Sequence, residues 1–222
     1  MMDMHQQILW NDAYLVAINK PSLVPTQPDP TGDTSLLESL EAFVKMPLFV
    51  IHRLDRVASG IVVFAKSKEA AAAISQQFQK KETQKIYLAI VESKPPKNAA
   101  TLIHFLKKNP QSNTSKAGDE ETKDSKRAEL HYILKGVSDR YFLLQIELLT
   151  GRHHQIRVQL GKIGCPIKGD VKYGARRSNL NRAIHLHAWQ LTFQHPSTEA
   201  SISLKALPDL TDTLWQYFTP IT

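Results

Sequence analysis

The chain has 222 residues, of which 42% are hydrophobic and 22% charged. This length is typical of one large domain or of one domain with small additions, and the composition excludes wholesale disorder. Lys and Arg number 28 against 21 Asp and Glu, a formal net charge of +7. Such a surplus favours a polyanionic partner, nucleic acid first, because neutralised phosphates release condensed counterions.

The cysteine content and the apolar stretches exclude several classes of protein. The single cysteine, Cys165, cannot form an intrachain disulfide or a cysteine-cluster zinc site, which fits a reducing compartment. No apolar stretch approaches the length of a membrane span, and the N-terminus lacks the basic-then-apolar pattern of a signal peptide. We therefore expect a cytoplasmic protein that is not attached to a membrane.

The first half of the sequence predicts short strands with helices between them. Segment 35–38 (Ser-Leu-Leu-Glu) has the pattern of a capping box that opens a helix, and a proline-rich loop precedes it. Ser67 can cap a second helix that runs to about Lys80. Alternating apolar residues, or short runs dense in β-branched and aromatic residues, predict strands, the first of them half-buried. These strands are 13–20, 49–51, 60–65 and 85–91.

The second half contains a long polar stretch. Between Lys107 and Arg127 the only aliphatic residue is Ala117, so we predict a flexible, solvated loop over 107–127. Strand-like patterns follow, and helices are expected near 153–162 and around Leu210, Leu214 and Phe218. The strands are 130–134, 141–148 and 201–205. Strands and helices are mixed without regular βαβ alternation, which predicts an α+β fold with a mixed, mostly antiparallel sheet in one domain, 1–222.

An aspartate between two arginines is the first candidate for chemistry. Segment 52–56 reads His-Arg-Leu-Asp-Arg and leads to Ser59-Gly60 and a predicted buried strand. Nearby cations favour an ionised carboxylate, which is the state that a nucleophile needs. A surface ion-pair turn of little energetic consequence explains the same residues equally well. On spacing alone the two interpretations are balanced.

Segment 150–158 is the second candidate. Gly151 can supply a tight turn, after which Arg152 and His153 begin a predicted helix, where free N–H groups and the helix dipole attract phosphate. Arg157 lies about one turn further and can reach a carboxylate from another segment. The alternative is a solvated, basic start of a helix.

Three weaker signals remain. Segment 164–174 holds three glycines, one proline and two lysines, one of them Lys172, and predicts a loop whose backbone approaches a ligand. It lacks the Gly-Lys-Ser/Thr ending of a nucleotide-binding loop. His185 and His187 alternate on a predicted strand, but without a third ligand we expect structural hydrogen bonds rather than metal binding. Tyr87, on a strand, is either a core or rim residue or a ring that stacks on a nucleobase.

Taken together, the segments resemble the ordered sequence blocks of the RluA family of RNA pseudouridine synthases. The blocks are Asn19-Lys20-Pro21, His52-Arg53-Leu54-Asp55 with Ser59-Gly60, 85–89, 150–158, 166–170 with Tyr173-Gly174, and 186–196. They cover most of the chain, and several ordered blocks are far more specific than any one of them. The departures are modest: Leu23 stands where the family usually has glycine, Ala58 where threonine is common, and Gln159 where histidine often follows.

The resemblance implies the pseudouridine synthase fold, with flanking helices, a central basic cleft and a reaction that needs no cofactor or metal. It makes Asp55 the nucleophile, Arg157 its ion-pair partner, and Tyr87 the ring that stacks on the target base. Arg53 fits the arginine that enters the RNA stack when uridine is flipped out. Basic side chains are expected to contact RNA. They are Lys20, Arg152, His153 and Lys172.

The resemblance therefore predicts an enzyme that isomerises uridine to pseudouridine in ribosomal or transfer RNA. Many relatives carry an N-terminal RNA-binding S4 domain, which we do not expect here because about eighteen residues precede Lys20. The alternative is a non-catalytic RNA-binding or ribosome-assembly factor on the same fold. A third possibility is a hydrolase that uses Asp55 on another bond of nucleic acid. It is disfavoured because the sequence offers neither metal ligands nor a second carboxylate paired with Asp55. We expect a monomer.

Overall fold

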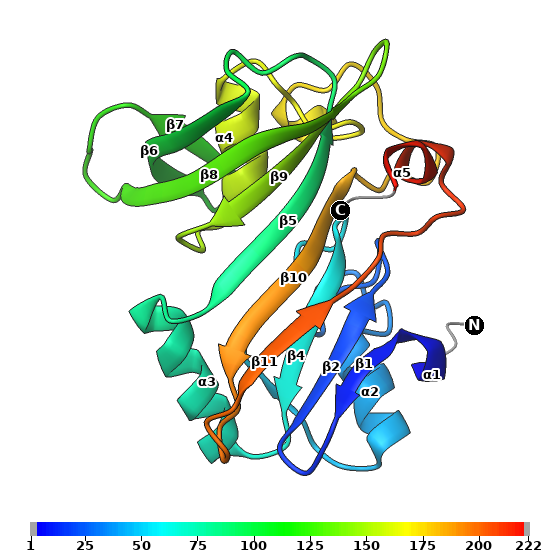
Figure 1. Ribbon diagram of the computed structural model, residues 1–222. Coiled ribbons are helices and arrows are strands. Elements are labelled where there is room, and N and C mark those ends of the chain that lie inside the picture. The colour runs from blue at the N-terminus through cyan, green and yellow to red at the C-terminus, as the bar shows by residue number, and fades with distance from the viewer. Residues whose placement is uncertain (1–3, 220–222) are drawn as a thin grey trace. The chain divides into compact units, whose positions relative to one another are not determined.

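A computed structural model describes residues 4–219, and its strands and helices fall into two units (Figure 1). Within the described residues, unit 1 comprises 4–85 and 187–211, and unit 2 comprises 86–186 and 212–219. In both units the strands are mostly antiparallel and the helices flank them, so the predicted α+β fold with a mixed, mostly antiparallel sheet is confirmed. No helix among residues 4–219 is long and apolar enough to cross a membrane.

Unit 1 contains a curled sheet. Its strands, in spatial order, are β1 (Ile8–Asn11), β2 (Leu15–Lys20), β4 (Ser59–Ala65), β10 (Leu186–Gln194) and β11 (Ser201–Lys205), with β3 (Phe49–Val50) beside the end of β4. β4 and β10 run parallel, and the other pairs are antiparallel. The edge strands β1 and β11 also lie against each other, so the sheet curls back on itself.

A hydrophobic core fills the curl. Every second residue of β2 and β4 faces it, because side chains alternate between the two faces of a strand. The buried residues are Leu15, Ala17, Ile61, Val63, Ala65, Ala70, Ile74, Leu191, Phe193, Ile202, Leu204 and Ala206. The prediction of a strand at 13–20 is confirmed from Leu15 on, but it is wrong to call it half-buried, since the four residues from Leu15 to Ile18 are at most 1% exposed.

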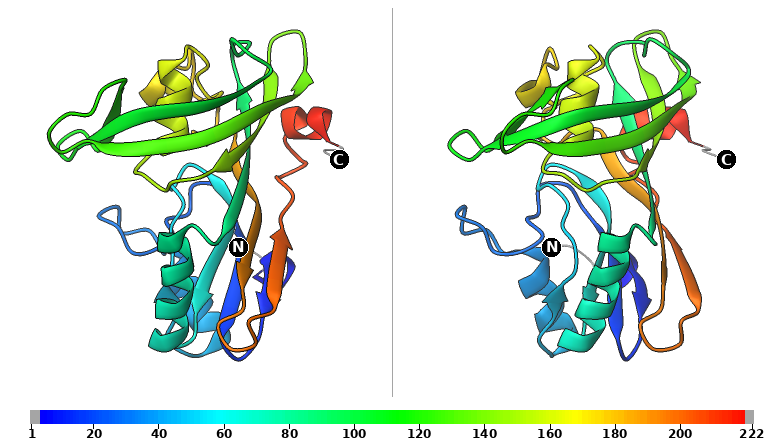
Figure 2. Two further views of the ribbon diagram at one scale, coloured as in Figure 1. Left: turned by 60° about the vertical axis from the view of Figure 1, so that its left-hand side comes forward. Right: turned by 90° about the vertical axis from the view of Figure 1, so that its left-hand side faces the viewer.

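The two longer helices of unit 1 begin where the sequence predicts. The helix α2 (Leu36–Val44) has the expected capping box, in which the Glu38 N–H donates to Ser35 Oγ at 3.3 Å and the Ser35 N–H donates to Glu38 Oε2 at 2.8 Å. Ser67 caps α3 (Lys68–Lys80), which packs on β3 and β4. A short helix α1 (Met4–Gln7) precedes β1. Figure 2 shows α2 and α3 beside the strands of this unit.

Unit 2 is built on an antiparallel sheet. Its strands, in spatial order, are β5 (Gln84–Val91), β9 (Phe142–Leu148), β8 (Lys126–Val137), β6 (Ala99–Asn109) and β7 (Thr114–Gly118). The helix α4 (Gln155–Lys162) packs on β6 and β7 and contacts a 3₁₀ helix, η1 (Val171–Tyr173). Near the C-terminus Asp212 caps α5 (Thr213–Phe218). The predicted closing helix is thus confirmed without Leu210, which lies before it.

The prediction of a flexible loop over 107–127 is wrong for much of this segment. β6 extends to Asn109, Thr114–Gly118 forms β7, and β8 begins at Lys126. The strand β7 buries Ser115 and packs Ala117 against a small cluster of Leu106, Ala128 and Val158, while Lys116 is exposed. An edge strand that buries only small side chains has little apolar signal in its sequence, which is why composition suggested a loop.

Candidate active site

Asp55 lies in unit 1, in the loop between β3 and β4. The Ala58 N–H donates to the Asp55 carbonyl at 3.0 Å and closes a turn immediately before β4 begins at Ser59. The side chain of Asp55 is half-buried, between the buried Leu54 and Ala58. The turn therefore holds the carboxylate at the end of a buried strand, where its backbone is fixed and its side chain is still partly accessible.

The two arginines beside Asp55 have different surroundings. The side chain of Arg53 is exposed, as a residue that enters an RNA stack requires. Arg56 instead donates to Thr31 Oγ1 at 2.6 Å and pairs with Asp33. Arg56 thus ties the loop that follows β2 to the turn, and only Arg53 remains as the exposed arginine of this segment.

Lys20 is wrongly predicted as an RNA contact, because its side chain is 0% exposed. Its ammonium group donates to the carbonyls of Pro21 and Val24, both at 2.9 Å, and of Arg56 at 3.3 Å. Burial is the largest cause that lowers the pKa of Lys20, and the positive charge of Arg56 lowers it further. The negative charge of Asp55 acts in the opposite direction, and the net result is a pKa of about 7. Lys20 is therefore an internal support of the Asp55 turn whose charge is coupled to that carboxylate.

Two histidines flank the same turn, His187 buried and His52 half-buried. His52 Nε2 accepts the N–H of Val63 at 3.1 Å, and its ring stacks on Phe78. His187 is 1% exposed; its Nε2 donates to the Ala206 carbonyl at 3.0 Å and its Nδ1 lies 2.8 Å from Ser59 Oγ. Burial of the rings lowers the pKa of each histidine to about 4. Both rings are therefore neutral at pH 7 and join β4 to its neighbours by hydrogen bonds.

These histidines predict a loss of stability in acid. The pKa of such a histidine is lower in the folded protein than in the unfolded chain, so the unfolded chain binds a proton first as the pH drops. The free energy of unfolding therefore falls between pH 6.5 and pH 4. Between pH 8 and pH 5 each such histidine is expected to remove about 2 kcal/mol from the free energy of unfolding. Urea unfolding of the wild type and of His187→Gln at both pH values measures it. Between the two pH values, the variant should lose about 2 kcal/mol less stability than the wild type. An equal loss in both would contradict the assignment. His131→Gln, the same change at a half-buried histidine, is the matched control.

A close approach of two backbones fixes the start of β4. In the parallel pairing of β4 with β10, Ser59 lies opposite His187 and Gly60 opposite Ala188. Gly60 has a φ of +114°, and a Cβ atom there would lie 2.3 Å from the Ala188 carbonyl oxygen. Only glycine fits this position, which explains why the Ser59-Gly60 pair follows the Asp55 turn.

Arg157 lies in unit 2, on α4. Its guanidinium forms two parallel hydrogen bonds with Asp170, Nε to Oδ2 at 2.7 Å and Nη2 to Oδ1 at 2.8 Å. The two side chains are 6% and 1% exposed. The guanidinium carbon also lies 5.1 Å from the ring centroid of Tyr173. The sequence did not single out Asp170 or Tyr173 as neighbours of Arg157, although both belong to the glycine-rich segment 164–174.

Histidines at the start of α4 tie the helix to the β6–β7 hairpin. His154 has a φ of 52°, so the helix begins at Gln155 rather than at His153 as predicted. The N–H of Ser115 donates to the Tyr173 hydroxyl at 2.8 Å, and that hydroxyl lies 2.7 Å from His154 Nδ1. The hairpin that looked like a loop in the sequence is therefore part of the support of this segment.

The other predicted residues of unit 2 lie near the same hairpin. His153 Nε2 lies 3.1 Å from the side-chain oxygen of Asn113, and the Lys172 ammonium donates to the Asn113 carbonyl at 3.3 Å. Arg152 is exposed and donates to the Arg127 carbonyl at 3.1 Å. The structure thus brings His153 and Lys172 together at the hairpin turn. Tyr87 is half-buried on β5, opposite Ile146 of β9.

Residues that could bind a metal are engaged elsewhere. Among residues 4–219, no group of three or more His, Cys, Asp and Glu side chains could hold a metal ion. His185 Nδ1 lies 3.1 Å from the Asn179 side chain and its Nε2 lies 3.2 Å from Asp212. Burial raises the pKa of the Cys165 thiol to about 11, so this cysteine is a buried, protonated residue at pH 7.

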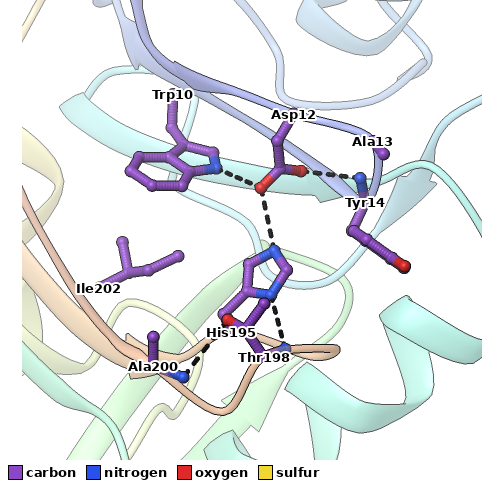
Figure 3. A pocket seen from close by; sticks show the side chains of 8 residues that line it. All are labelled: Trp10, Asp12, Ala13, Tyr14, His195, Thr198, Ala200 and Ile202. Carbon is purple, nitrogen blue, oxygen red and sulfur yellow. Dashed lines mark hydrogen bonds and ion pairs between the residues drawn. The ribbon is translucent and has the colours of Figure 1, made fainter.

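A pocket of about 240 Å³ lies elsewhere in unit 1, between the β1–β2 turn and the β10–β11 hairpin (Figure 3). Its polar groups bind one another: Asp12 Oδ2 accepts from Trp10 Nε1 at 2.7 Å and from His195 Nε2 at 2.9 Å. His195 Nδ1 accepts the N–H of Thr198 at 3.1 Å. This network joins two turns of the curled sheet and directs no polar group of its own at a ligand.

Comparison with known proteins gives consistent matches. Residues 14–162 match the family model described as RNA pseudouridylate synthase. The chain is 34% identical over 224 residues to tRNA pseudouridine synthase C of Pasteurella multocida, covering 90% of each chain. It is 33% identical over 207 residues to the uncharacterized RNA pseudouridine synthase YhcT of Bacillus subtilis, covering 90% of this chain and 67% of that one. It is 30% identical over 207 residues to ribosomal large subunit pseudouridine synthase C of Rickettsia prowazekii, again covering 90% and 67%.

The solved structures extend the likeness to the fold. Human RNA pseudouridylate synthase domain containing 4 superposes with a TM-score of 0.78 at 23% identity, covering 97% of this chain and 93% of that chain. Human RNA pseudouridylate synthase domain containing 1 superposes with a TM-score of 0.76 at 22% identity. The chain thus shares its fold with these two proteins.

Proposed function

The chain belongs to the RNA pseudouridylate synthase family and is an isomerase that acts on RNA; from this premise we propose that its substrates are uridines of ribosomal or transfer RNA and that Asp55 is its nucleophile. The relatives are named for both kinds of RNA, so both remain candidates. The cytoplasmic location and the monomeric state expected from the sequence stay predictions.

The proposed reaction is balanced without a cofactor. The bond between N1 of uracil and C1′ of ribose breaks, the base rotates, and a bond forms between C5 and C1′. The proton of C5 leaves and N1 gains one, so nothing is oxidised or reduced. Asp55 either attacks the sugar or helps to expel the base, and both orders of steps use an ionised carboxylate.

The surroundings of Asp55 support this role. Its carboxylate is half-buried in a turn closed by the Ala58 N–H, and its charge raises the pKa of the buried Lys20. A carboxylate whose backbone is fixed just before a strand and whose side chain stays partly accessible is suited to act as a nucleophile on a bound nucleotide. This is the observation that carries the proposal.

The other predicted residues take supporting roles in the proposal. Arg157, held by Asp170, pairs with the Asp55 carboxylate, and the half-buried ring of Tyr87 stacks on the target base. The exposed Arg53 fills the space left by the flipped uridine, whose extrusion costs a few kcal/mol and least in a loop. Exposed or half-buried basic side chains bind phosphates. They are Arg152, His153 and Lys172.

Pseudouridine mapping across total RNA tests the proposed function. We expect cells without this gene to lack pseudouridine at one or a few positions of ribosomal or transfer RNA. The purified protein should restore it on an unmodified transcript of the same RNA, with no metal or cofactor added. Identical maps, together with a defect in ribosome assembly, would instead support a non-catalytic RNA-binding factor.

A further inference from the structure

The residue before Asp55 is held by one side chain. The hydroxyl of Thr26 donates to the Leu54 carbonyl at 3.0 Å and accepts the N–H of the same residue at 3.3 Å. Thr26 is 4% exposed and Leu54 9%. A hydroxyl group can donate one hydrogen bond and accept others, so Thr26 satisfies both backbone groups of Leu54 away from water. Without it, two buried polar groups would lose their partner.

Thr26 is itself fixed by α2. The first N–H groups of a helix have no partner within the helix. Here the Leu36 N–H donates to the Pro25 carbonyl at 2.8 Å and the Leu37 N–H donates to the Thr26 carbonyl at 3.2 Å. A continuous path of hydrogen bonds therefore runs from the start of α2 through Thr26 to the peptide that precedes Asp55.

The residue after Asp55 is held by the same loop. The Arg56 carbonyl accepts the N–H of Leu23 at 2.7 Å and the ammonium of Lys20 at 3.3 Å. Leu23 has a φ of 71°, in the left-handed region that favours glycine, so this contact is kept at a conformational cost. The loop 21–33 thus binds the backbone on both sides of Asp55, and Thr26 supplies the contact on the N-terminal side.

We propose that Thr26 is a positioning residue for Asp55: by connecting α2 to the Leu54 peptide, its hydroxyl group fixes the direction in which the Asp55 carboxylate points. The inference rests on the proposed role of Asp55 as the nucleophile. Thr26 is buried, and its hydroxyl group is bound to the backbone of Leu54. Its loss should therefore affect the chemical step, which depends on the direction of the carboxylate, and leave RNA binding unchanged.

The test compares variants that differ by one hydroxyl or one methyl group. Thr26→Val keeps the shape and removes the hydroxyl, whereas Thr26→Ser keeps the hydroxyl. Because a displacement of about 1 Å at a reacting group can cost on the order of 100-fold in rate, we expect Thr26→Val to lower kcat by about 10- to 100-fold with KM unchanged. Thr26→Ser should restore most of kcat. Rates are compared after correction for the folded fraction measured by thermal unfolding.

Thr83→Val is the matched control. The Thr83 hydroxyl is also buried in unit 1, and it has no hydrogen-bond partner among the described residues, so its removal should leave kcat and KM as in the wild type. A wild-type kcat for Thr26→Val would overturn the inference. So would a loss of kcat that Thr26→Ser does not restore, or one that disappears on correction for the folded fraction.

Two further measurements keep the outcome decisive. If Thr26→Val does not fold, Thr26→Ala and Thr26→Ser are compared in single turnovers at a temperature where both are folded; equal rates would overturn the inference. Asp55→Asn separates the two proposals. Turnover by that variant would remove the proposed nucleophile, whereas an inactive Asp55→Asn with a fully active Thr26→Val would remove only the positioning role.

Discussion

The Asp55→Asn variant is expected to lose more than about 1,000-fold of the rate of pseudouridine formation while it still binds RNA. An amide has nearly the shape of a carboxylate but cannot act as the nucleophile. The turn itself should persist, because hydrogen bonds to the backbone of Leu54, Asp55 and Arg56 hold it. Single-turnover release of the C5 hydrogen from labelled RNA measures the rate, and RNA binding is measured separately.

The same variant distinguishes a reacting carboxylate from one that only stabilises the turn. Asp139→Asn, the same change at an exposed carboxylate, is the control and should turn over normally. Normal turnover by Asp55→Asn would end the assignment of the nucleophile. Because the charge of Asp55 raises the pKa of Lys20, the variant also favours a neutral Lys20. The pH dependence of unfolding would report that second effect without any measurement of activity.

Local signals in the sequence predicted the structure well. The capping box at Ser35 and the cap at Ser67 involve residues within one helical turn of each other, and both are confirmed. The strands at 60–65 and 85–91 are also confirmed, and β-branched and aromatic residues are enriched in strands. Asp55 was found because its neighbours in sequence are unusual, and the turn that holds it begins at those neighbours.

Contacts between distant segments were not predictable in the same way. Lys20 looked like an RNA contact because lysine is usually exposed, and only the fold shows that three backbone carbonyls surround its ammonium. The segment 107–127 looked like a loop because β7 buries only small side chains against α4. Thr26 has no motif of its own, and its partner Leu54 lies 28 residues away.

The pairing of Arg157 with Asp170 is another contact that spacing did not reveal. Segment 150–158 indicated only that Arg157 can reach a carboxylate from another segment. The glycines of segment 164–174 predicted a loop whose backbone approaches a ligand, and not an ion-pair partner for Arg157. In the structure η1 and the loop before it lie against α4, which brings the two side chains together across 13 positions of sequence. The pair is buried, so its energetic consequence is large and testable.

The Asp170→Asn variant is expected to lose about 3–5 kcal/mol of stability, which corresponds to a fall in Tm of about 10 °C for a chain of this length. Arginine keeps its charge at any accessible pH, and the variant removes the carboxylate that meets two of its N–H groups away from water. Thermal and urea unfolding measure the loss. Asp119→Asn is the control: its ion pair with Lys162 at 2.9 Å is exposed, so it should cost less than about 1 kcal/mol.

A double variant separates the structural role of the pair from its role in the reaction. Replacing both partners, Arg157→Met with Asp170→Leu, removes both buried charges together and should recover much of the stability lost in Asp170→Asn. It should not recover activity, because the proposed partner of the Asp55 carboxylate is then gone. A folded double variant with wild-type turnover would show that Arg157 only stabilises unit 2. A Tm for Asp170→Asn equal to that of the wild type would contradict the energetic argument itself.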